Sequence, residues 1–240
     1  MNKILLALVF AALAPAAHAT LENPFSGFEQ YAAGNLLKPF ALDLGGLLGA
    51  STVDTGRTYG VPGFWAGGDA VLQTRPSADD MILRDANVHS FALPMVQAGV
   101  GLPFGIDVIV HGMSAYGATF YGGGVRKSLY KTGLVDMFLP NVAVSAFGDK
   151  VNAGPFAATH VAANASATWS LPIIKPFVEA GYDSTKVAVG PSSLNLSATA
   201  NGVRYAAGVD LTPFPFVDLR LALLDLHGIS GGQLGLGVSF

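Results

Sequence analysis

The sequence predicts an all-β fold: a closed antiparallel up-and-down transmembrane β-barrel of about ten strands, with about twelve or eight as alternatives, and a short N-terminal helix. Three observations carry this prediction: an apolar composition without a membrane-spanning helix, strand-length segments of alternating side chains, and two kinds of turn in regular order. Of the 240 residues, 51% are hydrophobic and 12% are charged, and the mean hydropathy is +0.46. Because a soluble domain carries about 25% charged residues, this composition is typical of a membrane protein.

The most apolar run lies at the N-terminus, over residues 4–17 behind a lysine. It has about 14 residues, fewer than the roughly 18 that a membrane-spanning helix needs. Ala17 and Ala19 flank a histidine in the small-x-small pattern of a signal-peptidase site. We therefore expect residues 1–19 to be a cleaved signal peptide that the export translocon reads. An uncleaved anchor helix is the alternative.

The mature chain divides into two parts. In the first part, residues 20–60, apolar residues at helical spacing predict a short helix near 26–38, which Pro39 is expected to end. Residues 41–51 are rich in leucine and glycine and are compatible with a periplasmic helix, a plug in the barrel mouth or an extra strand. The second part, residues 61–240, is expected to form the barrel itself.

Alternation with period two is the main signal after residue 60. Residues 203–211 place valine, tyrosine, alanine and leucine on one face, with Arg204 and Asp210 on the other, and residues 217–223 repeat the pattern. The polar faces are small and rich in glycine, which suits a crowded barrel interior better than the charged, wetted face of a soluble sandwich. In lipid, a closed barrel also gives every backbone polar group a partner.

Two kinds of connection alternate along this part of the chain. Short Pro-containing turns are expected in the periplasm, and longer polar loops on the outside, the turns at 102–104, 139–140, 171–177 and 212–216 and the loops at 76–89, 114–118, 150–156, 188–201 and 226–231. Counting between them predicts strands at 61–75, 92–101, 105–113, 119–130, 138–149, 157–170, 174–187, 202–212, 216–226 and 232–240. This even number places both ends of the barrel on the periplasmic side.

The C-terminal strand resembles the assembly signal of outer-membrane barrels. Leu234, Leu236, Val238 and the terminal Phe240 share one face, and small residues occupy the other. The resemblance implies that the barrel-assembly machinery reads this strand. With the export signal, it predicts a location in the outer membrane of a Gram-negative bacterium, where the outer face of the barrel contacts lipid.

Three further motifs carry a wider resemblance: residues 35–40 before a glycine-rich stretch, residues 102–108, and residues 122–129. Through them, the whole mature chain resembles an uncharacterised family of outer-membrane β-barrel proteins that is distantly similar to long-chain fatty-acid transporter barrels. The resemblance implies a fold and a location. It supplies no substrate residues, because no position of this chain matches those of the fatty-acid transporters, which are considerably longer.

The alternation also predicts which charged side chains point into the lumen. They are Asp69, Asp107, His111, Arg126, Asp149, His160, Glu179, Asp183, Arg204, Asp210, Asp218 and Arg220. We expect them to form a charge network that fills a narrow barrel and satisfies its polar groups. A selectivity or substrate site is the alternative.

Several other classes of site are not expected. The chain has no cysteine, which excludes disulfides and thiolate metal sites. A net charge of −3 gives no basic footprint for nucleic acid. The glycine clusters lack the lysine and hydroxyl residue of a phosphate loop. His111 and His160 lack the spacing of metal ligands, so no metal, other cofactor or catalytic residue is predicted.

These observations favour a narrow pore or a carrier for a small or hydrophobic compound. The first alternative is a structural or adhesive barrel with a filled lumen, which acts on partners through surface loops 76–89 and 188–201. An outer-membrane hydrolase that uses His111, His160 and nearby aspartates is the least favoured reading, and we do not expect an enzyme.

Deleting Phe240 tests the C-terminal assignment. If the terminal aromatic residue is the assembly signal, the shortened protein should remain in the periplasm and be degraded, which fractionation and immunoblotting would measure. Normal insertion of the shortened chain into the outer membrane would contradict the assignment.

Overall fold

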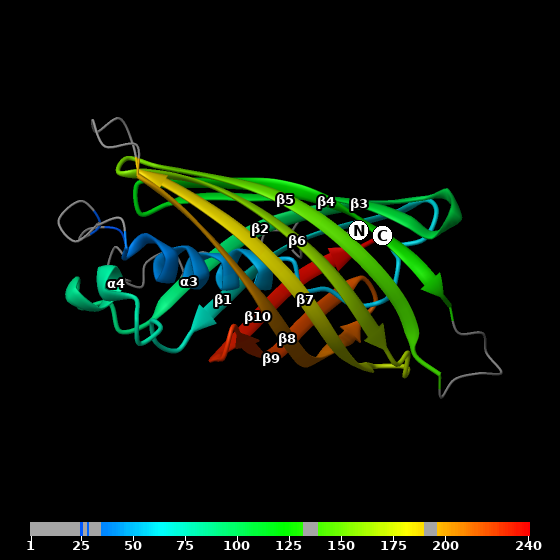
Figure 1. The fold of residues 1–240 in the computed structure, drawn as a ribbon. Helices are drawn as coiled ribbons and strands as arrows, with labels where there is room; N and C mark the ends of the chain where they lie inside the picture. Colours follow the sequence, from blue (N-terminus) through cyan, green and yellow to red (C-terminus); the bar gives the residue numbers. More distant parts are fainter. Residues whose placement is uncertain (1–24, 26–27, 29–34, 132–138, 190–195) are drawn as a thin grey trace.

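The structure, a computed structural model, describes residues 25, 28, 35–131, 139–189 and 196–240 (Figure 1). Ten strands form one closed antiparallel barrel in which each strand pairs with its neighbours in the chain. The strands are β1 (Gly63–Gln73), β2 (Phe91–Leu102), β3 (Ile106–Ala115), β4 (Ala118–Tyr130), β5 (Asn141–Ala153), β6 (Phe156–Thr168), β7 (Ile174–Val189), β8 (Ser197–Phe214), β9 (Val217–Leu226) and β10 (Ile229–Ser239). The predicted ten-stranded barrel is therefore confirmed.

The barrel closes where the first and last strands pair. β1 and β10 are antiparallel neighbours with Ala70 opposite Leu234. Beyond the last paired residues, Phe240 donates a 2.8 Å hydrogen bond to the Phe64 carbonyl and accepts one of 3.0 Å from the Phe64 amide. The Phe240 ring also stacks on Phe216, with centroids 6.1 Å apart. The C-terminal residue is thus part of the seam, while its reading by the assembly machinery stays a prediction.

The two faces of the wall differ sharply, because side chains alternate along each strand. In β6, every second residue from Phe156 is buried, and the residues between are mostly exposed. Large apolar side chains of the strands cover the outside, and Val161 and Leu223 are 57% and 78% exposed. An outer face of this kind suits contact with lipid chains.

The two rims carry different connections. The C-terminal rim holds Phe104, Phe216 and Phe240, and the opposite loop rim holds residues 74–90 with the short helix α4 (Met81–Asp85). The expectation of long polar loops at this second rim is wrong for three connections. Strands β3–β4, β5–β6 and β9–β10 are joined by two-residue turns at 116–117, 154–155 and 227–228. Loop length therefore does not distinguish the rims.

Two of these turns explain the error. Tyr116 and His227 have φ values of 56° and 58°, and each is followed by a glycine with positive φ. Two successive positive φ values define the hairpin turn that matches strand twist, which usually shows as Asn-Gly or Asp-Gly. Here Tyr-Gly and His-Gly occupy the position, so the usual sequence signal is missing.

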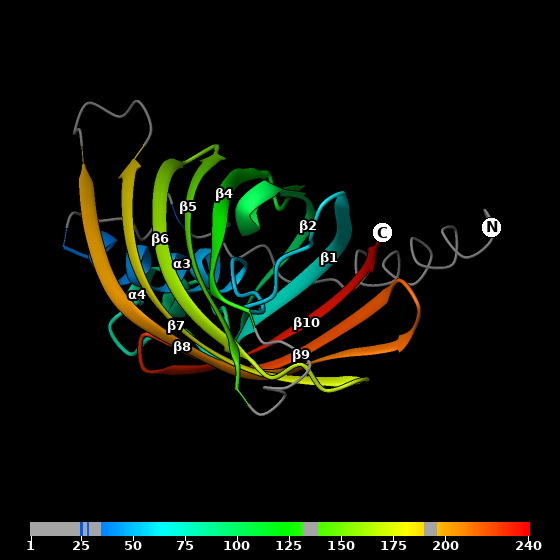
Figure 2. The ribbon, with the colours of Figure 1, turned by 90° about the vertical axis from the view of Figure 1, so that its right-hand side faces the viewer.

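A helix, α3 (Leu37–Ala50), lies inside the barrel (Figure 2). Of the three possibilities for residues 41–51, the plug is correct and the extra strand is wrong. The prediction that Pro39 ends a helix is also wrong, because Pro39 is the third residue of α3. Proline is tolerated in the first turn, where its missing N–H would have no helical partner. Most of the helix predicted at 26–38 lies outside the described residues, as does the signal peptide.

The plug helix packs closely on the wall through glycines. A Cβ added at Gly45 would lie 2.3 Å from Thr185 Oγ1, and one added at Gly49 would lie 2.3 Å from an Asp183 oxygen. Both distances are shorter than those of real Cβ atoms, so a side chain at Gly45 or Gly49 would require Thr185 or Asp183 to shift, and glycine lets α3 approach β7 this closely. Residues 51–62 then continue through the lumen to β1, which begins at the C-terminal rim.

The closed wall predicts resistance to detergent. Because every strand has two hydrogen-bonded neighbours, unheated protein in dodecyl sulfate should migrate differently from boiled protein on a gel. A chain truncated before β10 is the control and should show one mobility. Equal mobility of heated and unheated full-length protein would contradict a stable closed barrel.

Candidate functional site

The lumen contains almost all of the charged residues predicted to point inward. The structure buries Asp69, Asp107, His111, Arg126, Asp149, His160, Glu179, Asp183, Arg204, Asp210 and Arg220. Asp218 differs, since it is half-buried at the C-terminal rim, where it accepts hydrogen bonds from Thr212 and Ser239. The buried residues do not form one cluster. They bind the plug segment, which is α3 together with residues 51–62, at several points.

Asp54, in the segment after α3, joins two arginines from different strands. It forms ion pairs with Arg126 of β4 and with Arg220 of β9, the latter over 2.7 Å. Arg126 also pairs with Asp107 at 2.7 Å, and Arg220 donates a 2.9 Å hydrogen bond to the Val53 carbonyl. These contacts fix residues 53–55 in the part of the lumen that lies toward the C-terminal rim.

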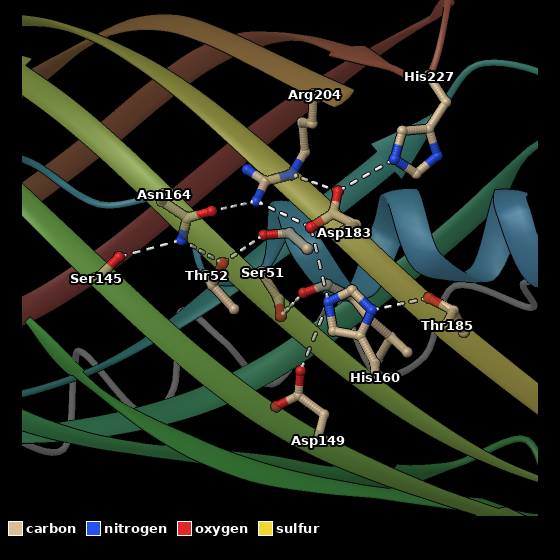
Figure 3. Close-up of polar contacts among 12 residues, drawn as sticks. Ser51, Thr52, Ser145, Asp149, His160, Asn164, Asp183, Thr185, Arg204 and His227 are labelled. Atoms are coloured by element: carbon tan, nitrogen blue, oxygen red, sulfur yellow. Dashed lines mark hydrogen bonds and ion pairs between the residues drawn. The ribbon is translucent and has the colours of Figure 1, made fainter. Parts of the chain in front are cut away.

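Arg204 of β8 is the centre of a second group (Figure 3). It forms ion pairs with Glu179 at 3.1 Å and Asp183 at 3.3 Å, and it donates a 2.8 Å hydrogen bond to Asn164. Asn164 in turn donates to Thr52 of the plug segment over 3.0 Å. The wall arginine therefore reaches the plug through one intervening amide.

Three histidines and two aspartates alternate around the wall. His111 lies 2.5 Å from Asp149, and His160 Nε2 lies 3.8 Å from both Asp149 and Asp183. Asp183 then pairs with His227 at 3.1 Å (Figure 3). The other ring nitrogen of His227 lies 3.0 Å from the Leu42 carbonyl of α3. The chain of ionisable groups thus ends on the plug helix.

The ring of Tyr59 contacts Arg126 near the C-terminal rim. The Arg126 guanidinium lies 4.5 Å from the centroid of the Tyr59 ring, and Tyr59 stacks on Trp65. Burial, followed by the charge of Asp54, raises the pKa of Tyr59, so its hydroxyl stays neutral at physiological pH. The ring therefore acts as a neutral partner for the buried guanidinium.

The opposite half of the lumen, toward the loop rim, is mainly apolar. Near the loop rim, Phe40 of α3 packs edge-on against Phe156 with centroids 5.2 Å apart, and Phe25 and Phe28 contact the same ring. Leucines on α3 extend this cluster along the helix. The described lumen is therefore divided into a mainly apolar half at the loop rim, where Asp43 and Asp80 are also buried, and a charged half.

Sequence reasoning did not identify Asp54, Tyr59 and His227. Asp54 and Tyr59 lie in a segment whose structure the sequence left open, and His227 lies in a turn that resembled a surface loop. The one available signal was chemical: buried arginines require carboxylates, and a polar stretch directly after an apolar one was a candidate source.

The chemistry available at this site is limited by access. Thr185, His160 and their neighbouring carboxylates have the order of a nucleophile, a base and an orienting acid, with Thr185 Oγ1 2.9 Å from His160. However, Thr185 lies directly beneath Gly45 and is 1% exposed. Within the described ranges, no group of three or more histidine or acidic side chains is arranged to hold a metal ion.

Comparisons with known proteins concern the architecture. No protein-family model matches the chain, and no curated protein sequence matches it. Among solved structures, the chain is similar to the N-terminal β-barrel domain of Pseudomonas aeruginosa OprF, with 13% identity, 72% of this chain and 99% of that chain covered, and a TM-score of 0.37. Neisserial surface protein A shows 16% identity, coverage of 73% and 95%, and a TM-score of 0.34. The KdgM porin shows 5% identity, coverage of 73% and 99%, and a TM-score of 0.39.

At these identities and scores, nothing of those proteins' activities is transferred to this chain. The predicted resemblance to fatty-acid transporter barrels stays a prediction. No helix of the described residues is long and apolar enough to cross a membrane.

Replacing Asp54 with asparagine tests whether its ion pairs with Arg126 and Arg220 anchor the plug segment. The change keeps the shape but leaves two buried guanidinium groups with one partner fewer, so it should cost about 3–5 kcal/mol in the free energy of unfolding. Urea unfolding in detergent micelles would measure this. Asp225→Asn, which removes an exposed carboxylate near the loop rim, is the matched control and should stay within about 0.5 kcal/mol of the parent protein. Equal unfolding midpoints for both variants would show that Asp54 does not anchor the plug.

Proposed function

We propose that this chain is a barrel of the Gram-negative outer membrane that carries a small hydrophobic compound and is closed at rest by its own N-terminal segment. One observation carries the proposal: an apolar cluster occupies the loop-rim end of the lumen, and α3, which fills it, buries a single charged side chain, Asp43. If the lumen only needed to be filled, charged side chains like those of the other half would serve equally well, so the apolar lining favours a hydrophobic solute.

The location rests on the composition, the closed wall and the apolar outer face. Charged residues are buried in the lumen, while valine, leucine and tyrosine cover the outside of the strands. This is the reverse of a soluble barrel and matches a barrel that is surrounded by lipid. The C-terminal rim is proposed to face the periplasm, because chains of this class end there.

The resting state is proposed to be closed to ions. Within the described residues, eleven of the fourteen residues of α3 are buried, and residues 51–59 cross the charged half of the lumen. Solute passage therefore requires part of the plug to move. The structure divides the plug into two parts that differ in how they are held.

The helix is the more easily displaced part. α3 contacts the wall mainly through apolar packing and glycines, and its polar links beyond the helix include a backbone carbonyl to His227 and the Asp43 carboxylate to Ser77. Residues 53–55, by contrast, are held by ion pairs with Arg126 and Arg220. We propose that α3 moves while residues 53–55 remain anchored, which opens the apolar half to a hydrophobic solute.

A structural or adhesive barrel is the second candidate, because the filled lumen equally suits a protein that acts only through its surface loops. The two candidates differ in whether the plug must move. An enzyme is not proposed, since Thr185 is covered by α3.

A reversible covalent lock separates the two candidates. A Cβ at Gly45 would lie 3.2 Å from the Thr185 Cβ, a few tenths of an ångström below the range of about 3.5–4.5 Å in disulfides. Thr185→Cys also removes the hydroxyl group that this Cβ would otherwise meet. The natural chain has no cysteine, so this is the one disulfide that Gly45→Cys with Thr185→Cys can form within a single chain. Cells with the oxidised double variant should take up a hydrophobic fluorescent probe, such as N-phenylnaphthylamine, at the rate of cells without the protein, and reduction should restore uptake.

The single variant Thr185→Cys is the control and should take up the probe equally under both conditions. Uptake by the oxidised, locked protein at the rate of the reduced one would contradict plug movement. If neither form exceeds cells without the protein, the structural or adhesive candidate would replace the carrier.

A further inference from the structure

Two buried carboxyl groups meet at the loop rim, one from the plug and one from the wall. Asp43 of α3 is 3% exposed, and Asp80, the N-cap of α4, is fully buried. The two side chains lie against each other. Asp43 accepts a 2.8 Å hydrogen bond from the Ser77 amide, and Asp80 accepts one of 3.1 Å from the Leu83 amide. These backbone bonds hold both carboxyl groups in place.

The pair has no cationic partner in the described part of the chain. No arginine, lysine or histidine there lies within ion-pairing distance of either carboxyl group. Two buried like charges repel, so a positive ion between them would be strongly favoured.

Further oxygens at the same place have no hydrogen-bond partner. They are Asp80 Oδ2, Gln73 Oε1 and Ser77 Oγ, all buried. Gln73 is fully buried at the end of β1, and the side chains of Gln73 and Ser77 both lie against Asp43. The side chains of Gln73 and Ser77 are close enough to donate to Asp43. The oxygens Gln73 Oε1 and Asp80 Oδ2 still have no donor, and buried acceptors of this kind beside two carboxylates favour a bound cation.

We propose that the side-chain oxygens of Asp43, Asp80, Gln73 and Ser77 bind one divalent cation of the calcium type, which joins the plug helix to the loop over residues 74–90. All four donors are hard oxygens, as calcium prefers, and two carboxylates balance its charge. They come from α3, from the end of β1 and from the following loop, and water or backbone carbonyls complete the coordination. Nitrogen and sulfur donors, which would favour zinc, are absent from this set.

The proposed ion has a mechanical consequence. The loop over residues 74–90 packs Ile82 and Leu83 into the same apolar cluster as Phe40 of α3. An ion between Asp43 and Asp80 would therefore hold the loop over residues 74–90 against α3. Cation binding does not depend on solute transport, so either proposal can fail without the other.

Calorimetric titration of the folded full-length barrel with calcium chloride, after removal of metals with a chelator, tests the site. The parent protein should bind one equivalent. Asp43→Asn and Asp80→Asn should each weaken binding by about tenfold or more, because affinity follows the number of charged ligands. Both changes keep an oxygen for the backbone bonds, and asparagine remains a good N-cap. The matched control, Asp225→Asn, should bind like the parent.

A second measurement uses the parent protein alone and so does not depend on the folding of a variant. Arg84 is exposed in α4, and trypsin should cut after it several times more slowly in millimolar calcium than in chelator. Absence of saturable binding of calcium or magnesium, or equal affinity in the parent and both aspartate variants, would overturn the proposal. The two carboxyl groups would then simply share a proton.

Discussion

The antiparallel pairing of β1 with β10 is the interaction on which the other features depend. A sheet of ten strands with free edges would leave two rows of backbone N–H and C=O groups without partners, which is prohibitive in lipid. Closure removes both edges and creates an inside and an outside. Alternation then assigns every side chain of a strand to one of them, so the apolar coat and the charged lumen both follow from the seam.

Closure also creates a problem of volume, which the N-terminal segment solves. The interior of the barrel is wider than the wall side chains fill, and three arginines and their carboxylates are buried there. Asp54 supplies negative charge from the plug to two of the arginines, while α3 supplies apolar bulk elsewhere. The segment therefore both fills and neutralises the lumen. Its two halves, one held by charge and one by packing, differ in what must be broken to move them.

The fold was largely predictable because alternation acts on every strand, and each expected strand overlaps an observed one. The plug was not, because α3 is apolar on most of its surface and so shows little of the periodicity that marks a surface helix. In the same region, Pro39 gave a wrong prediction, because proline is found both in the first turn of a helix and just after its end. The charged wall residues could be named from alternation. Their partners Asp54 and His227 could not, since an irregular segment and a turn have no period from which to infer direction.

The path of the plug restricts the order of assembly. The chain runs through the lumen from the loop rim to the C-terminal rim and only then turns back as β1, which forms one side of the seam. Drawing Phe40 and the leucines of α3 through a completed ring, past Arg126 and Arg220, would force bulky groups through a filled passage. We infer that the wall wraps around the plug: α3 and residues 51–62 are in place before β1 and β10 meet. The plug segment is then part of the core around which the strands assemble, and it is not inserted after the wall has closed.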